Sequence, residues 1–385
     1  VKRASSTVTT AAAILALTSA LSLAQTPPPN ALPNGGQVVA GSASIGQSSA
    51  VMDITQSSQR AAIDWQTFNV GSDATVNFHQ PGSSAVTLNR VLSHDPSQIF
   101  GQINANGQVY LTNPNGVYFA PGASVNVGGL IATTHSIGTD DFMAGRDHFT
   151  RDGATGNVVN EGNLTAALGG YIALLAPEVR NDGILLAQMG TVVLAAGEAY
   201  TLQFADDSLA GIEVEPATLN TMIENRHAVQ APDGLIILSA LAADTLQGSI
   251  VNSGSLEATS LTDVGGVIRL EGDDILLAEG SQLDASGALG GGAVLVGGDW
   301  QGGANEERRV YDDPDALYQA TTVTMEAGAS INASATESGD GGTVVMWSDV
   351  GKAGGFTRMD GEIFAAGAGG GVGGKVETSG HVLGV

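Results

Sequence analysis

The fold is decided by a short stretch at residues 160–175, which has the sequence NEGNLTAALGGYIALL. It joins an Asn-x-Gly-x-Leu-x-Ala motif to a pair of glycines and an apolar run. The motif returns 21 residues later as NDGILLA at 181–187, and again as NSGSLEA at 252–258. Looser copies lie at 328–333 and 361–365. Further apolar runs that begin with glycine occur at 190–194, 265–270, 291–296 and 341–346.

Each repeat is a unit of about twenty residues with two short strands separated by glycine turns. A unit of this size cannot bury its own apolar side chains, but stacked units cover one another and share one continuous core. Strands in such a stack are parallel, with inward Leu, Val and Ile alternating with outward Thr, Glu and Ser. The Asn and Gly positions suit sharp corners, because these residues tolerate a left-handed backbone. The repeat therefore predicts an all-β protein built as a parallel β-helix.

The composition agrees with many short strands and excludes several kinds of partner. The 385 residues include 54 glycines and no cysteine, so disulfides and thiolate metal sites are excluded. The chain carries 14 basic residues against 39 acidic ones, which gives a net charge of −25. Nucleic acids and anionic membrane surfaces both attract basic proteins, so we expect neither as a partner.

The first 24 residues have the features of a cleaved signal peptide. Lys2 and Arg3 precede an apolar run at 11–21, and small residues lead up to Ala24. A transmembrane anchor is the alternative, but the apolar run is too short and the prolines at 27–29 follow it. We therefore expect no stable membrane insertion.

The rest of the chain divides into two parts. Residues 25–150 are strand-like but lack the repeat, and we expect them to cap the raw end of the stack. Residues 151–385 continue as coils. Two polar stretches without the repeat, near 198–233 and 299–320, are expected to leave the stack as excursions.

A stiff turn interrupts two apolar strands at 109–119, where the sequence is VYLTNPNGVYF. Asn113, Pro114, Asn115 and Gly116 suit a type I turn, which favours Asn at its first position, Pro at its second and Gly at its fourth. Strand alternation on both sides of the turn then predicts which flanking side chains enter the core. These are Val109, Leu111, Val117 and Phe119.

An ordered string of motifs surrounds this turn within residues 65–134. It consists of Leu88, Asn89, Arg90 and Val91, then SQIFGQI at 97–103, the Asn113–Gly116 tetrapeptide, and VNVGGLIAT at 125–133, which contains Asn126, Gly128 and Gly129. This string resembles the secretion domain of the filamentous-haemagglutinin-like exoproteins of two-partner secretion, in the branch with the high-molecular-weight adhesins. A second tetrapeptide of some members, Asn-Pro-Asn-Leu, is missing here, since residues 80–83 are QPGS.

The resemblance implies a right-handed parallel β-helix with an N-terminal cap, and it places residues 25–150 in the cap and core of the secretion domain. It implies export by the Sec route and the periplasm of a Gram-negative bacterium. An outer-membrane β-barrel transporter with periplasmic domains would recognise the N-terminal domain, and the protein would be secreted or displayed at the cell surface. The tetrapeptide and its supporting residues would be the secretion motif. Adhesion to a host cell or surface is the expected function.

Two other classes of protein are the alternatives. Polysaccharide-acting enzymes share the parallel β-helix, but they cluster acidic residues on one strand face. The acidic doublets of this chain lie in loop-like stretches, and its six histidines have no metal-binding spacing. We therefore predict no catalytic residue, no cofactor and no metal site. The N-terminal part of a haemolysin or a contact-dependent inhibition toxin is the second alternative. The doublets are Asp140-Asp141, Asp206-Asp207, Asp273-Asp274 and Asp312-Asp313, and the histidines are His79, His94, His135, His148, His227 and His381.

Overall fold

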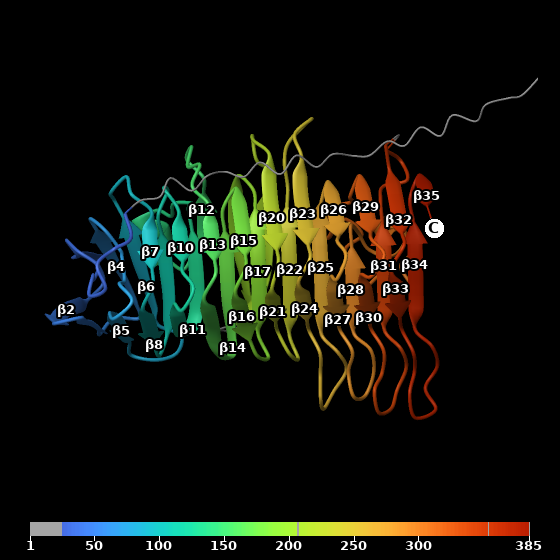
Figure 1. Cartoon of the computed structure of the whole chain (residues 1–385), viewed down its shortest axis with the longest axis horizontal. Coiled ribbons are helices and arrows are strands. Elements are labelled where there is room, and N and C mark those ends of the chain that lie inside the picture. Colours follow the sequence, from blue (N-terminus) through green and yellow to red (C-terminus); the bar gives the residue numbers. More distant parts are fainter. Residues whose placement is uncertain (1–24, 206–207, 353, 385) are drawn as a thin grey trace, which may run out of the picture.

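The chain forms one long stack of coils, with its N-terminal strands at one end and its C-terminal strands at the other (Figure 1). The computed structural model describes residues 25–205, 208–352 and 354–384, so the predicted signal peptide at 1–24 lies outside the described residues. The strands of successive coils pair in parallel along the stack. The prediction of an all-β parallel β-helix is confirmed. No helix in the described part of the chain is long and apolar enough to cross a membrane.

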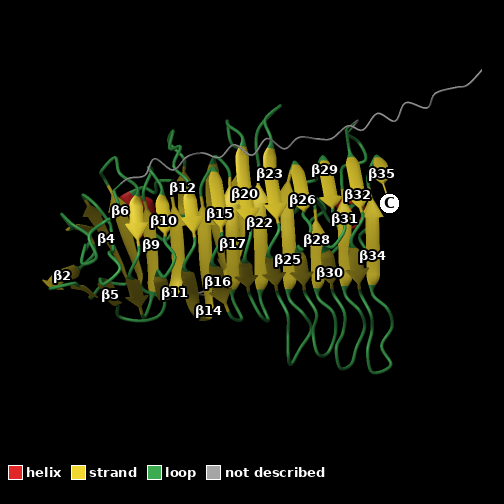
Figure 2. Cartoon of the chain, in the orientation of Figure 1, coloured by secondary structure: helices red, strands yellow, loops and turns green. Residues whose placement is uncertain are grey.

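From the coil with β7 (Ser97–Ile99) onward, each coil contributes strands to three faces, which we call the broad, narrow and third faces (Figure 2). The broad face contains β4 (Arg60–Trp65), β6 (Val86–Val91), β9 (Gln108–Thr112), β11 (Ser124–Thr133), β14 (Asn163–Leu175), β17 (Thr191–Ala196), β22 (Leu235–Ala240), β25 (Val267–Gly272), β28 (Ala293–Val296), β31 (Thr343–Trp347) and β34 (Lys375–Ser379).

The narrow face contains β3 (Val51–Gln56), β5 (Thr75–His79), β8 (Gln102–Ala105), β16 (Ile184–Ala187), β21 (Ala228–Gln230), β24 (Ser255–Glu257), β27 (Gln282–Asp284), β30 (Ser330–Asn332) and β33 (Glu362–Phe364). The long strands β11 and β14 run through both of these faces and join them. The third face contains β7 (Ser97–Ile99), β10 (Val117–Phe119), β13 (Val158–Asn160), β15 (Glu178–Asn181), β20 (Thr221–Asn225), β23 (Gly248–Asn252), β26 (Asp274–Leu277), β29 (Thr322–Met325), β32 (Phe356–Met359) and β35 (Val382–Gly384).

The repeat seen in the sequence corresponds to one corner of the coil, between the third and narrow faces. Its Asn ends a third-face strand and its Leu points inward from the next narrow-face strand, as Asn181 and Leu185 show. Its Gly lies where adjacent coils nearly touch, because a Cβ on Gly183 would come within 2.2 Å of the Gly162 carbonyl oxygen. Neither Asn181 nor Gly183 has a positive φ, so the expected left-handed backbone is wrong at this corner. Steric exclusion between coils explains the glycine instead.

The corner asparagines form a continuous ladder of buried amides, which we call the asparagine ladder. Its members Asn160, Asn181, Asn225 and Asn252 are each fully buried. Each Nδ2 donates to the Oδ1 of the next, at 2.8, 2.8 and 2.7 Å, and Asn252 Nδ2 ends the ladder on Ser281 Oγ at 2.6 Å. A buried amide without partners would destabilise the fold, and stacking satisfies each one through its neighbours.

The N-terminal end of the stack is closed by antiparallel strands. β1 (Gln37–Ala40) pairs antiparallel with β4, and β2 (Ala43–Ser48) pairs antiparallel with β3. The strand-like stretches between β3 and β11 already lie in coils. The cap therefore covers the first coil. Because β1 pairs with the outer edge of β4, that edge is not available to a strand of another chain.

The outer side of the broad face is covered by segments that leave the stack at one corner. The helix α1 (Thr139–Met143), β12 (His148–Thr150), β18 (Ala199–Ala205) and β19 (Ser208–Glu215) form the first cover, in which β18 pairs with both other strands. They enclose a second apolar core against outward residues such as Leu88, Tyr110 and Ile131. Within the predicted excursion at 198–233, β20 and β21 belong to the stack and only the part up to β19 leaves it.

The predicted excursion at 299–320 covers a later part of the same face. It begins with the short 3-10 helix η1 (Trp300–Gly303), and its Trp300 and Leu317 pack against Leu295, Val345 and Trp347 of the sheet. At the corner between the narrow and broad faces, four glycine-rich loops project from the stack and lie against one another (Figure 2). They span 258–266, 285–292, 333–342 and 365–374.

Candidate functional site

The Asn113–Gly116 turn lies between β9 and β10 and is mostly buried. The Gly116 N–H donates to the Asn113 carbonyl at 3.0 Å, which closes the turn, and the Asn115 N–H donates to Asn113 Oδ1 at 3.0 Å. Asn113 is fully buried, Asn115 is half-buried, and only Pro114 is exposed. Gly116 has a φ of +118°, a backbone conformation that a residue with a Cβ rarely adopts. The four flanking residues predicted to point inward are each at most 2% exposed.

The two asparagine side chains of this turn reach back to the preceding coil. Asn113 Nδ2 donates to the carbonyl of Asp95 and to Ser97 Oγ, both at 3.0 Å. Asn115 Nδ2 donates to the carbonyl of Ser93 at 2.9 Å. These bonds join the 92–96 corner to the coil that follows it.

The turn also supports the coil that follows. The Gly156 N–H donates to the Pro114 carbonyl at 3.2 Å, and the Val117 N–H donates to Asn157 at 3.0 Å. A Cβ on Gly156 would approach the Asn115 carbonyl carbon to 2.5 Å. The tetrapeptide is therefore hydrogen-bonded to the 92–96 corner of the preceding coil and to residues 156–157 of the following coil.

The Leu88–Val91 motif contributes to three different environments. Leu88 is buried in the second core and Val91 in the main core. Asn89 is fully buried, accepts a bond from Trp65 Nε1 at 3.0 Å and donates to the Tyr110 carbonyl at 3.2 Å. These three residues are explained by packing and by amide satisfaction within the sheet.

Arg90 and Arg60, on strands of the broad face, bind residues of the segment that forms the first cover. Arg90 donates through Nε to Asp64 at 2.8 Å and through Nη1 to Thr139 Oγ1 at 2.7 Å, at the start of α1. Arg60 binds Asp147 through two parallel bonds of 3.0 Å, and its guanidinium lies 4.8 Å from the Phe142 ring. Bidentate pairs of this kind fix orientation as well as adding energy.

The glycines of the 125–133 run permit close packing, whereas Asn126 does not contact the core. A Cβ on Gly128 would lie 2.8 Å from the Gly107 carbonyl oxygen, and one on Gly129 would lie 2.7 Å from the Tyr171 ring. The Tyr171 hydroxyl donates to Gln108 Oε1 at 2.6 Å, and burial raises its pKa well above the usual range. Asn126 is exposed on the outer side of the narrow face.

Sequence reasoning missed the residues that these motifs contact. Arg60, Asp147 and Ser93 carry no motif, and their roles depend on contacts between segments far apart in the chain. Asn225, the third asparagine of the ladder, was also missed, because His227 replaces the glycine of the repeat. The spacing of Asn225, Val229 and Ala231 was the available signal.

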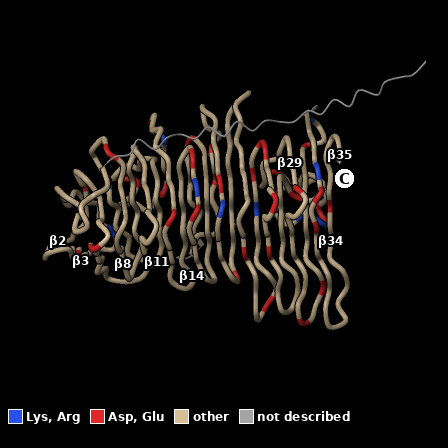
Figure 3. Tube along the Cα trace, in the orientation of Figure 1, with Lys and Arg blue, Asp and Glu red and all other residues tan. Residues whose placement is uncertain are grey.

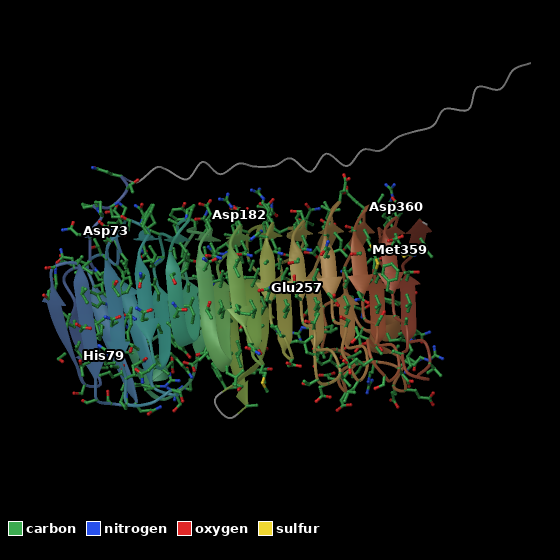
Figure 4. All side chains as sticks on the ribbon, turned by 60° about the horizontal axis from the view of Figure 1, so that its bottom comes forward. Asp73, His79, Asp182, Glu257, Met359 and Asp360 are labelled. Atoms are coloured by element: carbon green, nitrogen blue, oxygen red, sulfur yellow. The ribbon has the colours of Figure 1, made fainter. Side chains whose placement is uncertain are left out.

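The acidic doublets and histidines do not converge. Asp140 and Asp141 lie on α1, and Asp206-Asp207 lies outside the described residues. Asp273 accepts bonds from the Gly248 N–H and from the Tyr318 hydroxyl, so it supports a corner of the stack. Among the described residues, no group of three or more His, Asp or Glu side chains could hold a metal ion. The labelled residues in Figure 4 are spread along the whole stack.

Charged side chains in the middle of the stack form ion pairs on the third face. Arg180 binds Glu161 at 3.2 Å and Asp182 at 2.7 Å, and Arg226 binds Glu224 at 2.8 Å. In Figure 3, short basic stretches lie beside acidic ones in the middle of the stack. These partly exposed ion pairs stabilise the stack modestly, and they do not create a basic surface.

A family model described as the TPS secretion domain matches residues 24–289. The chain belongs to the TPS secretion domain family. The solved HMW1 secretion domain of Haemophilus influenzae superimposes with a TM-score of 0.74 at 28% identity, over 92% of this chain and 96% of that one. Two curated Heme/hemopexin-binding proteins of Haemophilus influenzae are each 34% identical, over 260 residues (66% of this chain) and 295 residues (70%). The matched stretches make up 28% and 31% of the length of those relatives.

These comparisons agree with the resemblance drawn from residues 65–134. The TPS secretion domain of this chain contains the Asn113–Gly116 turn, the Leu88–Val91 motif and the first cover within the matched range. The 28% identity to a solved secretion domain extends over nearly all of the described coils.

Proposed function

We propose that this chain is the secretion region and first stem of a two-partner-secretion exoprotein. An outer-membrane β-barrel transporter binds it through periplasmic domains and exports it, after passage through the Sec route in a Gram-negative bacterium. The observation that carries the proposal is the family match over residues 24–289, in a fold whose motif residues meet in consecutive coils. We include residues 1–24 as the signal peptide and residues 25–150 as cap and core of the recognised domain.

The proposed activity of the exported protein is adhesion, carried out at the cell surface or after release. Support comes from the match to the HMW1 secretion domain and from the rod of coils beyond residue 151, which can hold further segments away from the membrane. The relatives named Heme/hemopexin-binding proteins support capture of a haem carrier as a second candidate. We propose no enzymatic activity, no cofactor and no nucleic-acid partner.

Co-expression with the transporter tests the secretion role. The wild-type chain should appear outside the cell only when the barrel is present. Asn115→Ala removes the bond to the Ser93 carbonyl and should lower export at least several-fold, whereas Asn163→Ala, at an exposed site on β14, should be exported like the wild type. Export that does not depend on the barrel would overturn the proposal.

A further inference from the structure

The sequence contains three Asn-Gly pairs, which are Asn34-Gly35, Asn106-Gly107 and Asn115-Gly116. In such a pair the backbone nitrogen of the glycine can reach the side-chain carboxamide of the asparagine with little steric hindrance, because glycine has no Cβ. The nitrogen attacks Cγ, the Cγ–Nδ2 bond breaks, and ammonia leaves with the proton that the attacking nitrogen gives up. Water then opens the five-membered imide to aspartate or isoaspartate.

The Asn106-Gly107 pair is held by hydrogen bonds that oppose this reaction, although Asn106 is exposed. Asn106 Oδ1 accepts from the Gln80 N–H at 2.7 Å, and Asn106 Nδ2 donates to the Gln80 carbonyl at 2.8 Å. The Gly107 N–H donates to Gln80 Oε1 at 2.9 Å. The attacked carboxamide and the attacking nitrogen are therefore both engaged, and all three bonds must break before the pair reacts.

The Asn115-Gly116 pair is engaged in the same way within the secretion motif. Asn115 Nδ2 donates to the Ser93 carbonyl at 2.9 Å, and the Gly116 N–H donates to the Asn113 carbonyl at 3.0 Å. Asn115 is also half-buried and Gly116 is buried. This pair is therefore protected by the turn that it forms.

The Asn34-Gly35 pair has no such protection. Both residues are exposed, and among the described residues no hydrogen bond holds the Asn34 side chain or the Gly35 N–H. The Asn34 carbonyl, in contrast, accepts from the Gln66 N–H at 3.0 Å and from the Thr67 N–H at 3.3 Å. Negative charge that develops on the Gly35 nitrogen is shared with this carbonyl oxygen, so the two donors stabilise the ionised form that attacks.

We infer that Asn34 is a site of spontaneous deamidation in the folded chain, and that its isoaspartyl product loosens the cap. Asn34 forms an antiparallel bridge to Thr67 just before β1. In isoaspartate the backbone runs through Cγ, and the former Asn34 carbonyl becomes a carboxylate outside the main chain. The backbone gains one methylene at the bridge, so the bonds from Gln66 and Thr67 no longer hold the segment that leads into β1. This chemistry needs no transporter and is separate from the proposed function.

Ageing of the purified full chain tests the site, and Asn106 is the matched control because it is an exposed asparagine in the same dipeptide. The chain is incubated at mildly alkaline pH, which favours the ionised nitrogen, and its proteolytic peptides are followed by mass spectrometry. Asn34 should be deamidated at least about tenfold faster than Asn106, because three hydrogen bonds protect Asn106. Equal rates at the two asparagines overturn the inference.

The same incubation in urea is the second control. Unfolding removes the protecting bonds, so the three pairs should react at similar rates and the advantage of Asn34 should disappear. If Asn34 keeps the same advantage in urea, the fold does not select the site and the inference is wrong.

Asn34→Gln tests the effect on the cap. Glutamine would have to form a larger ring, so this variant should be modified far more slowly at position 34, and it should fold because the Asn34 side chain has no partner among the described residues. Hydrogen exchange at the Gln66 and Thr67 N–H groups should become severalfold faster after ageing of the wild type and stay constant in Asn34→Gln. Unchanged exchange in an aged wild type that contains isoaspartate at 34, or equal acceleration in the variant, overturns the effect on the cap.

Discussion

The asparagine ladder should dominate the stability of the middle coils, and Asn181→Ala is the change that tests it. In the folded protein Asn181 Nδ2 donates to Asn225 Oδ1 at 2.8 Å and to the Gly183 carbonyl at 3.1 Å. Asn181 Oδ1 accepts from Asn160 Nδ2 at 2.8 Å and from the Gly183 N–H at 3.4 Å. All of these groups are away from water, so alanine leaves them unpaired.

The expected loss follows from those bonds. Three of them are at 3.1 Å or shorter, and each contributes about 0.5–1.5 kcal/mol net, while an orphaned buried group costs about 1–3 kcal/mol. We therefore expect Asn181→Ala to lower the free energy of unfolding by about 3 kcal/mol. Asn163 is exposed and lies in the same coil, so Asn163→Ala should lower the free energy of unfolding by less than about 0.5 kcal/mol.

Urea unfolding at neutral pH, followed by far-ultraviolet circular dichroism, measures both variants. The two free energies can be compared if the slope of unfolding free energy against urea concentration is the same for both variants. A changed slope would indicate that part of the stack unfolds separately. If Asn181→Ala unfolds within about 0.5 kcal/mol of Asn163→Ala, the ladder does not stabilise the fold and the reasoning is refuted.

Two further predictions concern a buried histidine and the stacked loops. Burial lowers the pKa of His135 from 6.5 to about 4, and its Nε2 lies 3.1 Å from the Gly197 carbonyl, so the folded state holds it neutral while the unfolded state takes up a proton below pH 6.5. The free energy of unfolding should fall by up to about 3 kcal/mol as the pH drops from 6.5 to 4. In His135→Gln the free energy of unfolding, measured with urea at several pH values in that window, should depend less on pH. An equal dependence on pH in the wild type and the variant would contradict this. A Cβ on Gly291 would lie 1.8 Å from the Ala333 carbonyl oxygen, whereas one on Gly82 has no neighbour within 4 Å. Gly291→Ala should therefore cost about 1–3 kcal/mol and lower the thermal midpoint by several degrees, and a midpoint equal to that of Gly82→Ala would be the contrary result.

The local sequence repeat was sufficient to predict the parallel β-helix, because a β-helix makes the same contacts in every coil. One Asn, one Gly and one inward Leu recur at fixed spacing, and each has a physical role that depends only on its neighbours one coil away. The pattern failed at Asn225, where His227 stands in place of glycine and a coil was assigned to an excursion. The turn at 113–116 was predicted from its residue types alone, since Pro and Gly restrict backbone angles locally.

The contacts that make the candidate site were decided by the tertiary structure. Residue types did not indicate that Asn115 would reach the Ser93 carbonyl or that Arg60 would bind Asp147, 87 residues away. Such contacts depend on which corners lie above one another and on where the covers return to the broad face. The sequence by itself determined a parallel β-helix with a stiff turn near its start. Only the stacking register decided that the turn is mostly buried and that most of the neighbouring residues 92–96 are exposed, because burial at a corner depends on the coils on either side of it.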